Sequence, residues 1–168
     1  MAQVTLKGNP CNLAGTMPKV GDTIPDFNLT AADLSPITKA SLAGKRKVVV
    51  VLPSLDTPVC QMETRQFNQR ATALGDDVVV LIASADLPFA MNRFCAAEGL
   101  KNVKTGSDMR DREFGKRWGV AIADGPLAGL TARAIFVTDA NDKIVYEELV
   151  PEIAQEPNYD AALSALKK

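Results

Sequence analysis

A buried strand, a turn and a helix start follow one another between residues 47 and 74, and this stretch constrains the fold most. The run Val48–Leu52 is a continuous series of Val and Leu closed by Pro53, which is typical of a strand buried on both faces. Thr57 followed by Pro58 predicts a helix start, because Thr is a good N-cap and Pro lacks only an N–H that the first helical position does not need.

This helix start places Cys60 at the third helical position. Unpaired N–H groups and the positive end of the helix dipole lie close to that position, and both favour a thiolate over a thiol. We expect the sulfur on the packed side of the helix, partly sheltered from water, because it begins a stripe at spacings of four and three. The stripe consists of Cys60, Thr64, Phe67, Ala71 and Leu74. The alternative is that Cys60 is simply a small core residue.

The composition excludes several classes of site. The chain contains no His, so a Ser-His-Asp triad, a Cys-His pair and a His-ligated metal site cannot be built within it. An activated Cys60 must therefore rely on Arg, Lys or a helix end. The formal net charge of −1 gives no overall attraction to nucleic acid or to anionic membranes. We interpret the basic cluster Lys45–Lys47 as a solvated lead-in to the strand.

One domain, residues 1–168, accounts for the whole chain. With 46% hydrophobic residues, a chain of this length buries roughly 70% of its unfolded surface in a single core. No apolar run reaches the roughly 18 residues of a membrane span, and Met1–Leu13 lacks the pattern of a signal peptide, so we expect a cytoplasmic protein that binds no membrane. The three cysteines, Cys11, Cys60 and Cys95, show no Cys-x-x-Cys spacing, so we expect any disulfide to be transient.

The order of the remaining patterns predicts an α/β fold with a mixed central sheet and helices on both faces. A strand, a helix and a second buried strand form a parallel crossover unit, and two later strands form an antiparallel hairpin. The other expected elements are a hairpin decoration in residues 1–15 with its turn at Gly8–Pro10, strands at 26–30, 78–83, 103–105, 134–138 and 143–146, helices at 89–98, 112–118 and 159–166, and a loop at 120–130.

This order is that of the thioredoxin fold, in which the first crossover helix starts with a redox cysteine. A dithiol reductase needs Cys-x-x-Cys there, whereas Thr57 stands in place of the first sulfur. A single activated thiolate suits a peroxide, because attack on the O–O bond gives sulfenic acid and water or an alcohol. Cys95 on the next helix is the natural second thiol. Its Cα atom must come within roughly 4.4 to 6.8 Å of that of Cys60, so we expect local unwinding.

Arg133 is the candidate cation for Cys60. It stands just before the predicted strand 134–138, where apolar neighbours make a charge conspicuous. Its permanent positive charge would favour the thiolate and donate to a peroxide, together with the Thr57 hydroxyl and the N–H groups of the helix start. The alternative is an ordinary surface Arg beside a strand.

Several separate motifs resemble one known family. The pattern Pro53-x-x-x-Thr57-x-x-Cys60 resembles the active-site motif of peroxiredoxins. Together with the segments Ser84–Ala90, Arg93–Cys95 and Gly119–Leu127, it resembles the bacterial thiol peroxidases, which are atypical two-cysteine peroxiredoxins with a thioredoxin-like fold. The similarity covers nearly the whole chain, including the N-terminal hairpin.

The resemblance implies a role for each motif residue. Cys60 would be the peroxidatic cysteine and Cys95 the resolving one, joined in an intrachain disulfide. Thr57 would hydrogen-bond the thiolate and the peroxide, Pro53 would shield the sulfur from water, and Arg133 would activate it. The family takes hydrogen peroxide and alkyl hydroperoxides, is reduced by thioredoxin, usually forms homodimers, and needs neither a metal nor an organic cofactor.

Other readings stay open from the residues alone. One is a thioredoxin-fold binding or chaperone module whose cysteines only pack, in which Cys60 would react slowly with alkylating agents. Another is a disulfide reductase, which Thr57 disfavours. Cys11 has no implied role; its neighbours Asn9, Pro10 and Asn12 suggest a hairpin surface or a turn, and we interpret it as structural or incidental.

Overall fold

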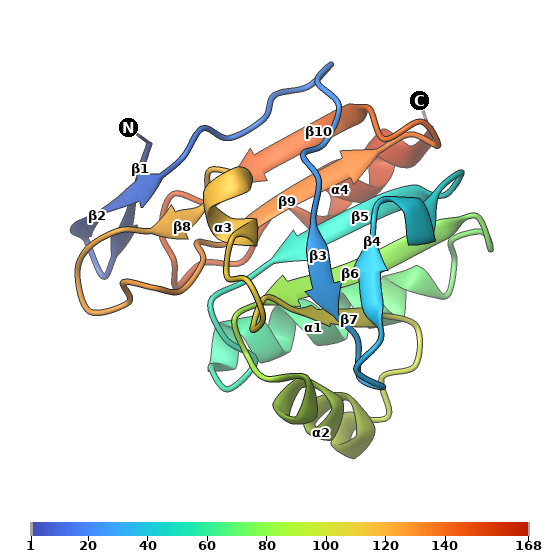
Figure 1. Cartoon of the computed structure of the whole chain (residues 1–168), viewed down its shortest axis with the longest axis horizontal. Helices are drawn as coiled ribbons and strands as arrows, with labels where there is room; N and C mark the ends of the chain where they lie inside the picture. Colours follow the sequence, from blue (N-terminus) through green and yellow to red (C-terminus); the bar gives the residue numbers. More distant parts are fainter. Residues whose placement is uncertain (1, 168) are drawn as a thin grey trace.

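A mixed sheet of seven strands forms the centre of the computed structural model, which describes residues 2–167 (Figure 1). The strands are β1 (Gln3–Leu6), β2 (Asn9–Ala14), β3 (Asn28–Thr30), β4 (Pro36–Thr38), β5 (Arg46–Val51), β6 (Val78–Ser84), β7 (Lys104–Ser107), β8 (Ala121–Ile122), β9 (Ala134–Thr138) and β10 (Ile144–Leu149). The helices are α1 (Pro58–Ala71), α2 (Pro88–Glu98), α3 (Phe114–Arg117) and α4 (Tyr159–Ser164), with 3-10 turns at Ala40–Leu42 and Ala165–Lys167. The central sheet has the order β10-β9-β5-β6-β7-β3-β4, and a smaller sheet has the order β1-β2-β8.

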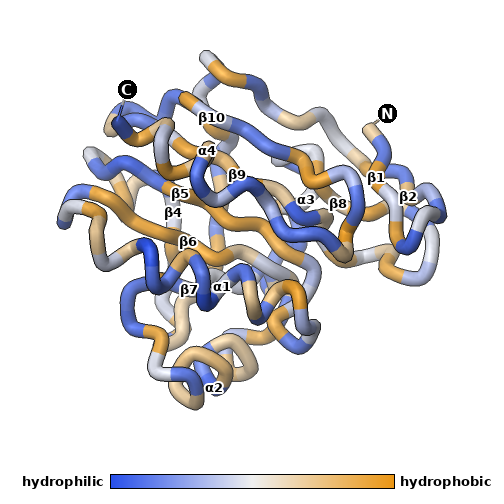
Figure 2. The backbone as a smooth tube through the Cα atoms, turned by 180° about the vertical axis from the view of Figure 1, so that it is seen from behind, coloured by the Kyte–Doolittle hydropathy of each residue, from blue (hydrophilic) through white to orange (hydrophobic). Residues whose placement is uncertain are grey.

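The two faces of the central sheet bury alternate residues of the same strands, as a period of two requires. Val48 and Val50 of β5 pack in the cluster that contains residues of α1 and α4, whereas Val49 and Val51 pack in the cluster that contains α3 and the N-terminal hairpin. Figure 2 shows the hydrophobic residues concentrated along β5 and β6. The predicted α/β fold, with a mixed sheet and helices on both faces, is confirmed.

The predicted crossover unit is also confirmed. β5 and β6 are parallel neighbours, with Val48 opposite Val80, and α1 connects them. Thr57 is the N-cap residue of α1 with extended backbone angles, φ −112° and ψ 147°. Pro58 is the first helical residue, so Cys60 is the third.

The turn of the N-terminal hairpin begins one residue earlier than predicted. Its turn residues are Lys7 and Gly8, with φ 51° and 83°, because a two-residue turn with positive φ values matches the twist of the strands. Asn9 and Pro10 belong to β2. Cys11 lies opposite Val4 and is 1% exposed, so its expected place at the surface was wrong.

Several short elements differ from the sequence prediction. The short helix begins at Phe114 instead of 112, because Arg112 has a φ of 56° that a right-handed helix cannot include. β3 begins at Asn28 instead of 26. β4 was not predicted, and β8 lies inside the predicted loop 120–130, where Ile122 pairs with Leu13 of β2.

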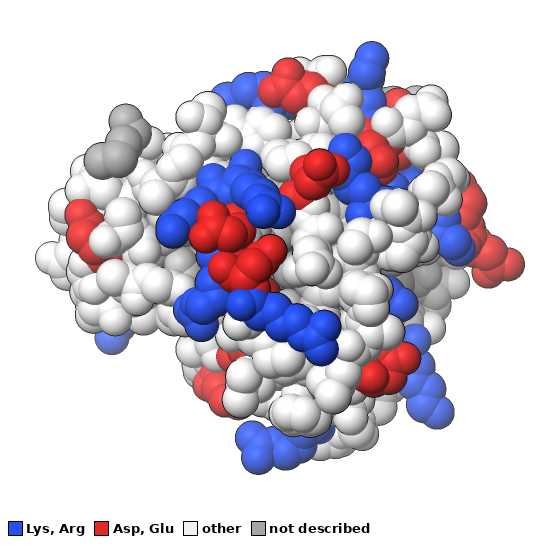
Figure 3. All heavy atoms as spheres, in the orientation of Figure 1, with Lys and Arg blue, Asp and Glu red and all other residues white. Residues whose placement is uncertain are grey.

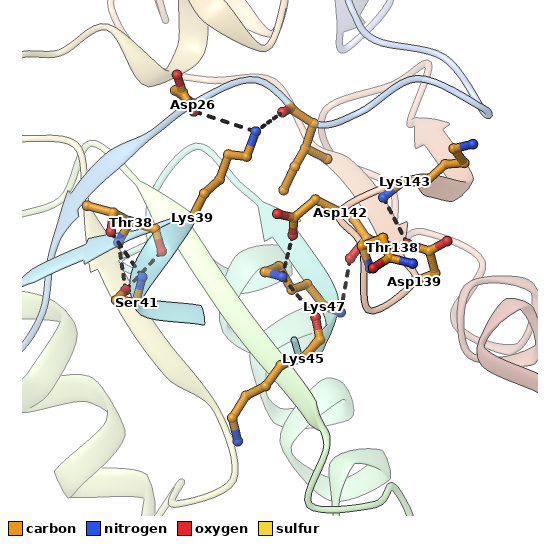
Figure 4. Close-up of polar contacts among 12 residues, drawn as sticks. Asp26, Thr38, Lys39, Ser41, Lys45, Lys47, Thr138, Asp139, Asp142 and Lys143 are labelled. Atoms are coloured by element: carbon orange, nitrogen blue, oxygen red, sulfur yellow. Dashed lines mark hydrogen bonds and ion pairs between the residues drawn. The ribbon is translucent and has the colours of Figure 1, made fainter. Parts of the chain in front are cut away.

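Lys47 is buried, which corrects its interpretation as part of a solvated lead-in. Its side chain is 0% exposed, and Nζ donates to Asp142 Oδ1 at 2.5 Å and to the carbonyl oxygen of Lys45 at 2.8 Å (Figure 4). β9 pairs with β5 so that Lys47 lies opposite Thr138. This pairing brings the β9–β10 turn, which contains Asp142, over the start of β5. Lys45 itself remains exposed.

Charges of both signs are mixed on the surface. On the face drawn in Figure 3, Lys and Arg lie beside Asp and Glu, and neither sign forms a continuous field, in line with a net charge of −1. No helix within residues 2–167 has both the length and the apolar character needed to cross a membrane. The same residues contain no group of three or more His, Cys, Asp or Glu that could hold a metal ion.

Candidate active site

Cys60 lies at the amino end of α1, next to the carboxyl end of β5. Its side chain is 0% exposed and packs in the cluster that contains Leu55 and Phe67, so the shelter expected from the sequence is complete. The amide of Gln61 donates to the carbonyl oxygen of Thr57 at 3.0 Å, which is the first intrahelical bond. The amides before Gln61 therefore have no acceptor within the helix, and their positive ends favour an anion at this sulfur.

Arg133 reaches Cys60 because of the sheet register. β9 runs antiparallel to β5 with Ala134 opposite Val51, so the residue before Ala134 lies where β5 ends and α1 approaches. Its side chain points to the same face as Ile135 two residues later, which packs in the Cys60 cluster. Nη1 of Arg133 donates to Cys60 Sγ at 3.3 Å, and the side chain is 2% exposed. The alternative of an ordinary surface Arg is excluded.

The guanidinium of Arg133 is held from three directions. Nε and Nη2 both donate to the carbonyl oxygen of Ile153, at 3.0 and 2.8 Å. Nη1 also donates to Glu63 Oε2 at 2.5 Å. Burial acts against the charged form, but the neighbouring Glu63 and Cys60 outweigh it and raise the pKa of Arg133. The cation beside the sulfur therefore has a fixed orientation.

Glu63 is the site residue that sequence reasoning missed. It is 0% exposed, and burial raises its pKa to about 7 although Arg133 acts in the opposite direction. Glu148 and Glu156 raise the pKa further. Within the described residues, its Oε1 has no hydrogen-bond partner. The available signal was its spacing, because a residue three positions after Cys60 lies on the same side of the helix.

Thr57 stands at the surface end of the site. It is exposed, and its hydroxyl donates to the carbonyl oxygen of Ser54 at 2.8 Å, while its amide donates to the same oxygen at 3.2 Å. A hydroxyl has only one proton. In this arrangement the proton is committed to Ser54, so Thr57 Oγ1 is available as an acceptor and not as the donor expected from the sequence.

A cavity of about 230 Å³ adjoins these residues, and Pro53, Thr57 and Arg133 all line it. Pro53 itself is buried. The other walls are mainly apolar and come from Leu6, Pro58, Val59, Leu127, Leu130, Ile153 and Ala154. The N-terminal hairpin, expected as a decoration, therefore supplies Leu6 to the cavity, and the loop 120–130 supplies two leucines.

Cys95 lies outside this group. It is the eighth residue of α2, is half-buried, and lines a separate cavity of about 440 Å³ beside β7 together with Lys101 and Thr105. Burial raises the pKa of its thiol. Cys11, Cys60 and Cys95 are all free. The structure thus brings Pro53, Thr57, Cys60 and Arg133 together and leaves Cys95 apart.

The Redoxin family model matches residues 19–163. A thiol peroxidase of Leptospira interrogans is 52% identical over 167 residues, which are 98% of this chain and 97% of the relative. A thiol peroxidase of Mycobacterium tuberculosis is 54% identical over 166 residues, 99% of each chain. The structure of a peroxiredoxin-like protein from Aquifex aeolicus superposes with a TM-score of 0.92 at 41% identity, covering 99% of this chain and 97% of that one. The chain therefore belongs to the Redoxin family and, within it, to the thiol peroxidases.

Proposed function

We propose that this protein reduces hydrogen peroxide and alkyl hydroperoxides by attack of the Cys60 thiolate. One observation carries the proposal: a sulfur buried at a helix amino end lies 3.3 Å from the guanidinium nitrogen of Arg133. Both neighbours stabilise a thiolate, which is the reactive form of cysteine.

In the first step, the thiolate attacks one oxygen of the peroxide and the O–O bond breaks. Cys60 is oxidised to sulfenic acid, and the second oxygen leaves as hydroxide or alkoxide, which then takes up a proton. Arg133 stabilises the charge on the leaving oxygen, and Thr57 Oγ1 accepts the O–H of the incoming hydroperoxide. Pro53 keeps water away from the sulfur. The mainly apolar cavity walls suit an alkyl group as well as hydrogen peroxide.

In the second step, Cys95 attacks the sulfenic acid, which forms a Cys60–Cys95 disulfide and releases water. α1 and α2 lie side by side, tied by the Arg65–Glu98 pair at 2.7 Å (Figure 1). Cys60 is the third residue of one helix and Cys95 the eighth of the other. Cys60 packs in the core cluster beneath α1, whereas Cys95 lines the cavity beside β7, so the two side chains lie in different surroundings.

A disulfide requires Cα atoms roughly 4.4 to 6.8 Å apart, and in this arrangement both thiols are free and Cys60 is fully buried. At least one helix end must open before the bond forms. Re-reduction then needs an external dithiol, because the remaining thiol, Cys11, is 1% exposed. We propose thioredoxin as the reductant in that step. We also propose that the protein works as a homodimer in the cytoplasm, and light scattering of the purified protein tests whether it is a dimer.

Mass mapping of the cysteines after one equivalent of hydrogen peroxide tests the mechanism. We expect a Cys60–Cys95 link in the wild type, and sulfenic acid at Cys60, trapped by dimedone, in Cys95→Ser. Cys60→Ser should consume no peroxide, while Cys11→Ser serves as the control and keeps full turnover with thioredoxin. Slow, nonselective alkylation of Cys60 in the reduced protein, together with turnover that survives both Cys60→Ser and Cys95→Ser, would instead support a binding module with structural cysteines.

A further inference from the structure

The residues before α2 make a second polar centre that the proposed chemistry does not use. The carboxylate of Asp86 accepts three hydrogen bonds: from Ser54 Oγ at 2.7 Å, from the amide of Leu55 at 2.8 Å and from Ser84 Oγ at 2.7 Å. Ser84 ends β6, whereas Ser54 and Leu55 belong to the loop that leads from β5 into α1. One side chain thus connects the end of one parallel strand with the approach to Cys60.

The backbone of Asp86 is fixed as well. Its amide donates to Ser84 Oγ at 3.1 Å, and its carbonyl oxygen accepts a hydrogen bond from Ser107 Oγ at the end of β7. Ser84 and Ser107 are 1% and 0% exposed. Because α2 begins two residues after Asp86, these bonds also fix the start of the helix that carries Cys95.

Ser54 passes this constraint on to the active site. Its carbonyl oxygen accepts hydrogen bonds from both the amide and the hydroxyl of Thr57, at 3.2 and 2.8 Å. Its side-chain oxygen also accepts a bond from the amide of Asp56 at 3.2 Å. Thr57 is the N-cap of α1, three residues before Cys60. Asp86 therefore touches neither the sulfur nor the cavity and acts on both through Ser54.

We propose that Asp86 is a positioning residue that holds Thr57 and Cys60 in the peroxide-reactive arrangement, and that its bonds to Ser54 and Leu55 must break before Cys60 can reach Cys95. This inference rests on the proposed function. Hydrogen bonds to a carboxylate are about twice as strong as neutral ones, so the same contacts that favour the first step resist the second. Weakening them should slow attack on peroxide and accelerate disulfide formation.

Asp86→Asn tests this opposition. The amide group offers one acceptor oxygen instead of two and carries no charge, so at least one of the two bonds to the α1 approach must be lost or reversed in direction, and both become weaker neutral bonds. We expect the rate constant of Cys60 with hydrogen peroxide to fall about tenfold through misplacement of the reacting groups. We expect the intramolecular step to become roughly fivefold faster, because local opening costs less.

The second step can be measured without peroxide by using the aromatic disulfide dithiobis(nitrobenzoate). One thiolate attacks the reagent, which forms a mixed disulfide and releases one thionitrobenzoate. The other thiolate of the pair then displaces the second thionitrobenzoate as the Cys60–Cys95 bond forms. The rate of this second release reports the approach of the two helices, in a Cys11→Ala background that removes the third thiol.

Asp56→Asn is the matched control, because it removes the same charge from an exposed side chain in the same loop. It should leave both rates at the wild-type value. Ser54→Ala removes a single bond to Asp86 and should shift both rates in the same directions as Asp86→Asn, by less. Amide hydrogen exchange of residues 54–60 in the reduced protein should rise in Asp86→Asn, stay unchanged in Asp56→Asn, and rise to an intermediate level in Ser54→Ala.

Two results would overturn the inference: equal rates in Asp86→Asn and Asp56→Asn, or a parallel loss of both steps in folded Asp86→Asn, which would show only structural support. Should Asp86→Asn fail to fold, the same two criteria apply to Ser54→Ala. The release assay consumes no peroxide. A wild type that releases thionitrobenzoate but reduces no peroxide would therefore contradict the proposed function and still leave the effect of Asp86 measurable.

Discussion

Cys60 and Cys95 occupy opposite ends of neighbouring helices, and their surroundings differ in every respect that controls thiol reactivity. Cys60 is in the first turn of α1, is 0% exposed and accepts a bond from Arg133. Cys95 is in the second half of α2, is half-buried, and within residues 2–167 its sulfur makes no hydrogen bond to a side chain. Burial raises the pKa of Cys95.

The difference shows how one residue type can take two roles without any histidine. The helix dipole favours an anion at the amino end and disfavours one near the carboxyl end, so the two positions act on the thiols in opposite ways. A buried guanidinium adds its charge at one of them only. In the mechanism that we propose, Cys60 is thereby prepared as a nucleophile, whereas Cys95 keeps its proton until the sulfenic acid is presented to it.

Removing the cation should abolish most of this contrast and is the largest effect that we expect. Arg133→Met leaves Cys60 with the helix end alone, and Glu63 buried without its counter-ion. The rate constant of Cys60 with hydrogen peroxide, measured by competition with a reporter peroxidase, should fall roughly 10²- to 10³-fold. Arg133→Lys keeps the positive charge but lacks the planar guanidinium, so its rate constant should lie between those of the wild type and Arg133→Met.

Arg117→Met is the matched control, because Arg117 is an exposed arginine at the end of α3. It should react with peroxide as the wild type does. Circular dichroism of each variant separates a loss of activity from a loss of fold. A folded Arg133→Met that reacts within twofold of Arg117→Met would mean that the helix amino end alone makes the difference between the two cysteines.

The next prediction concerns how the stability of the fold depends on pH. It tests the surroundings of Cys60, because Glu63 and Cys60 both accept a hydrogen bond from Arg133. The pKa of Glu63 is raised from 4.5 to about 7 by burial, against the effect of Arg133. Between these values the folded chain holds a proton that the unfolded chain has released. The stabilisation from the protonated carboxyl is complete below pH 4.5 and is lost as the pH rises toward about 7.

Glu63→Gln has no such proton. The melting temperature of the variant minus that of the wild type should therefore rise by roughly 5 °C across this window and be level on either side. Thermal unfolding of both proteins in a pH series measures it. In Glu98→Gln the difference should be level across this window and show a small, opposite trend only below pH 4.5, because Arg65 holds the pKa of the exposed Glu98 below its usual value. A flat difference for Glu63→Gln would show that Glu63 stays ionised throughout.

The local sequence pattern could predict the helix start around Cys60, because the residues that form it are neighbours in the chain. Val48–Leu52, Thr57 and Pro58 fix a strand, a cap and a helix start, and these alone put Cys60 where a thiolate is stabilised. Arg133 could be chosen as the candidate cation because it stands just before a predicted strand. Its contact with Cys60, however, depends on the antiparallel pairing of β9 with β5.

Buried charges could not be predicted from local pattern. Glu63 and Lys47 look like ordinary solvated residues, yet both are 0% exposed. Their partners, Arg133 and Asp142, lie 70 and 95 residues away in the chain. No neighbouring residue in the sequence therefore indicates that either ion pair forms. β8 is similar, since its two residues pair with Leu13 and Ala14 of β2, which lie far away in the chain.

The smallest expected effect changes the Cys95 side of the comparison alone. Ala97 is an exposed residue near the end of α2, and Ala97→Gly weakens the helix by about 0.5–1 kcal/mol. Because burial is the cause of the raised pKa of Cys95, opening this helix end should favour its thiolate and increase its rate of alkylation by iodoacetamide roughly two- to fivefold. Mass spectrometry of both cysteine peptides from one sample provides the internal control, since Cys60 on α1 should react at the wild-type rate. An equal increase at both sites would show that α1 and α2 open together as one unit, and that the two cysteines are not independently held.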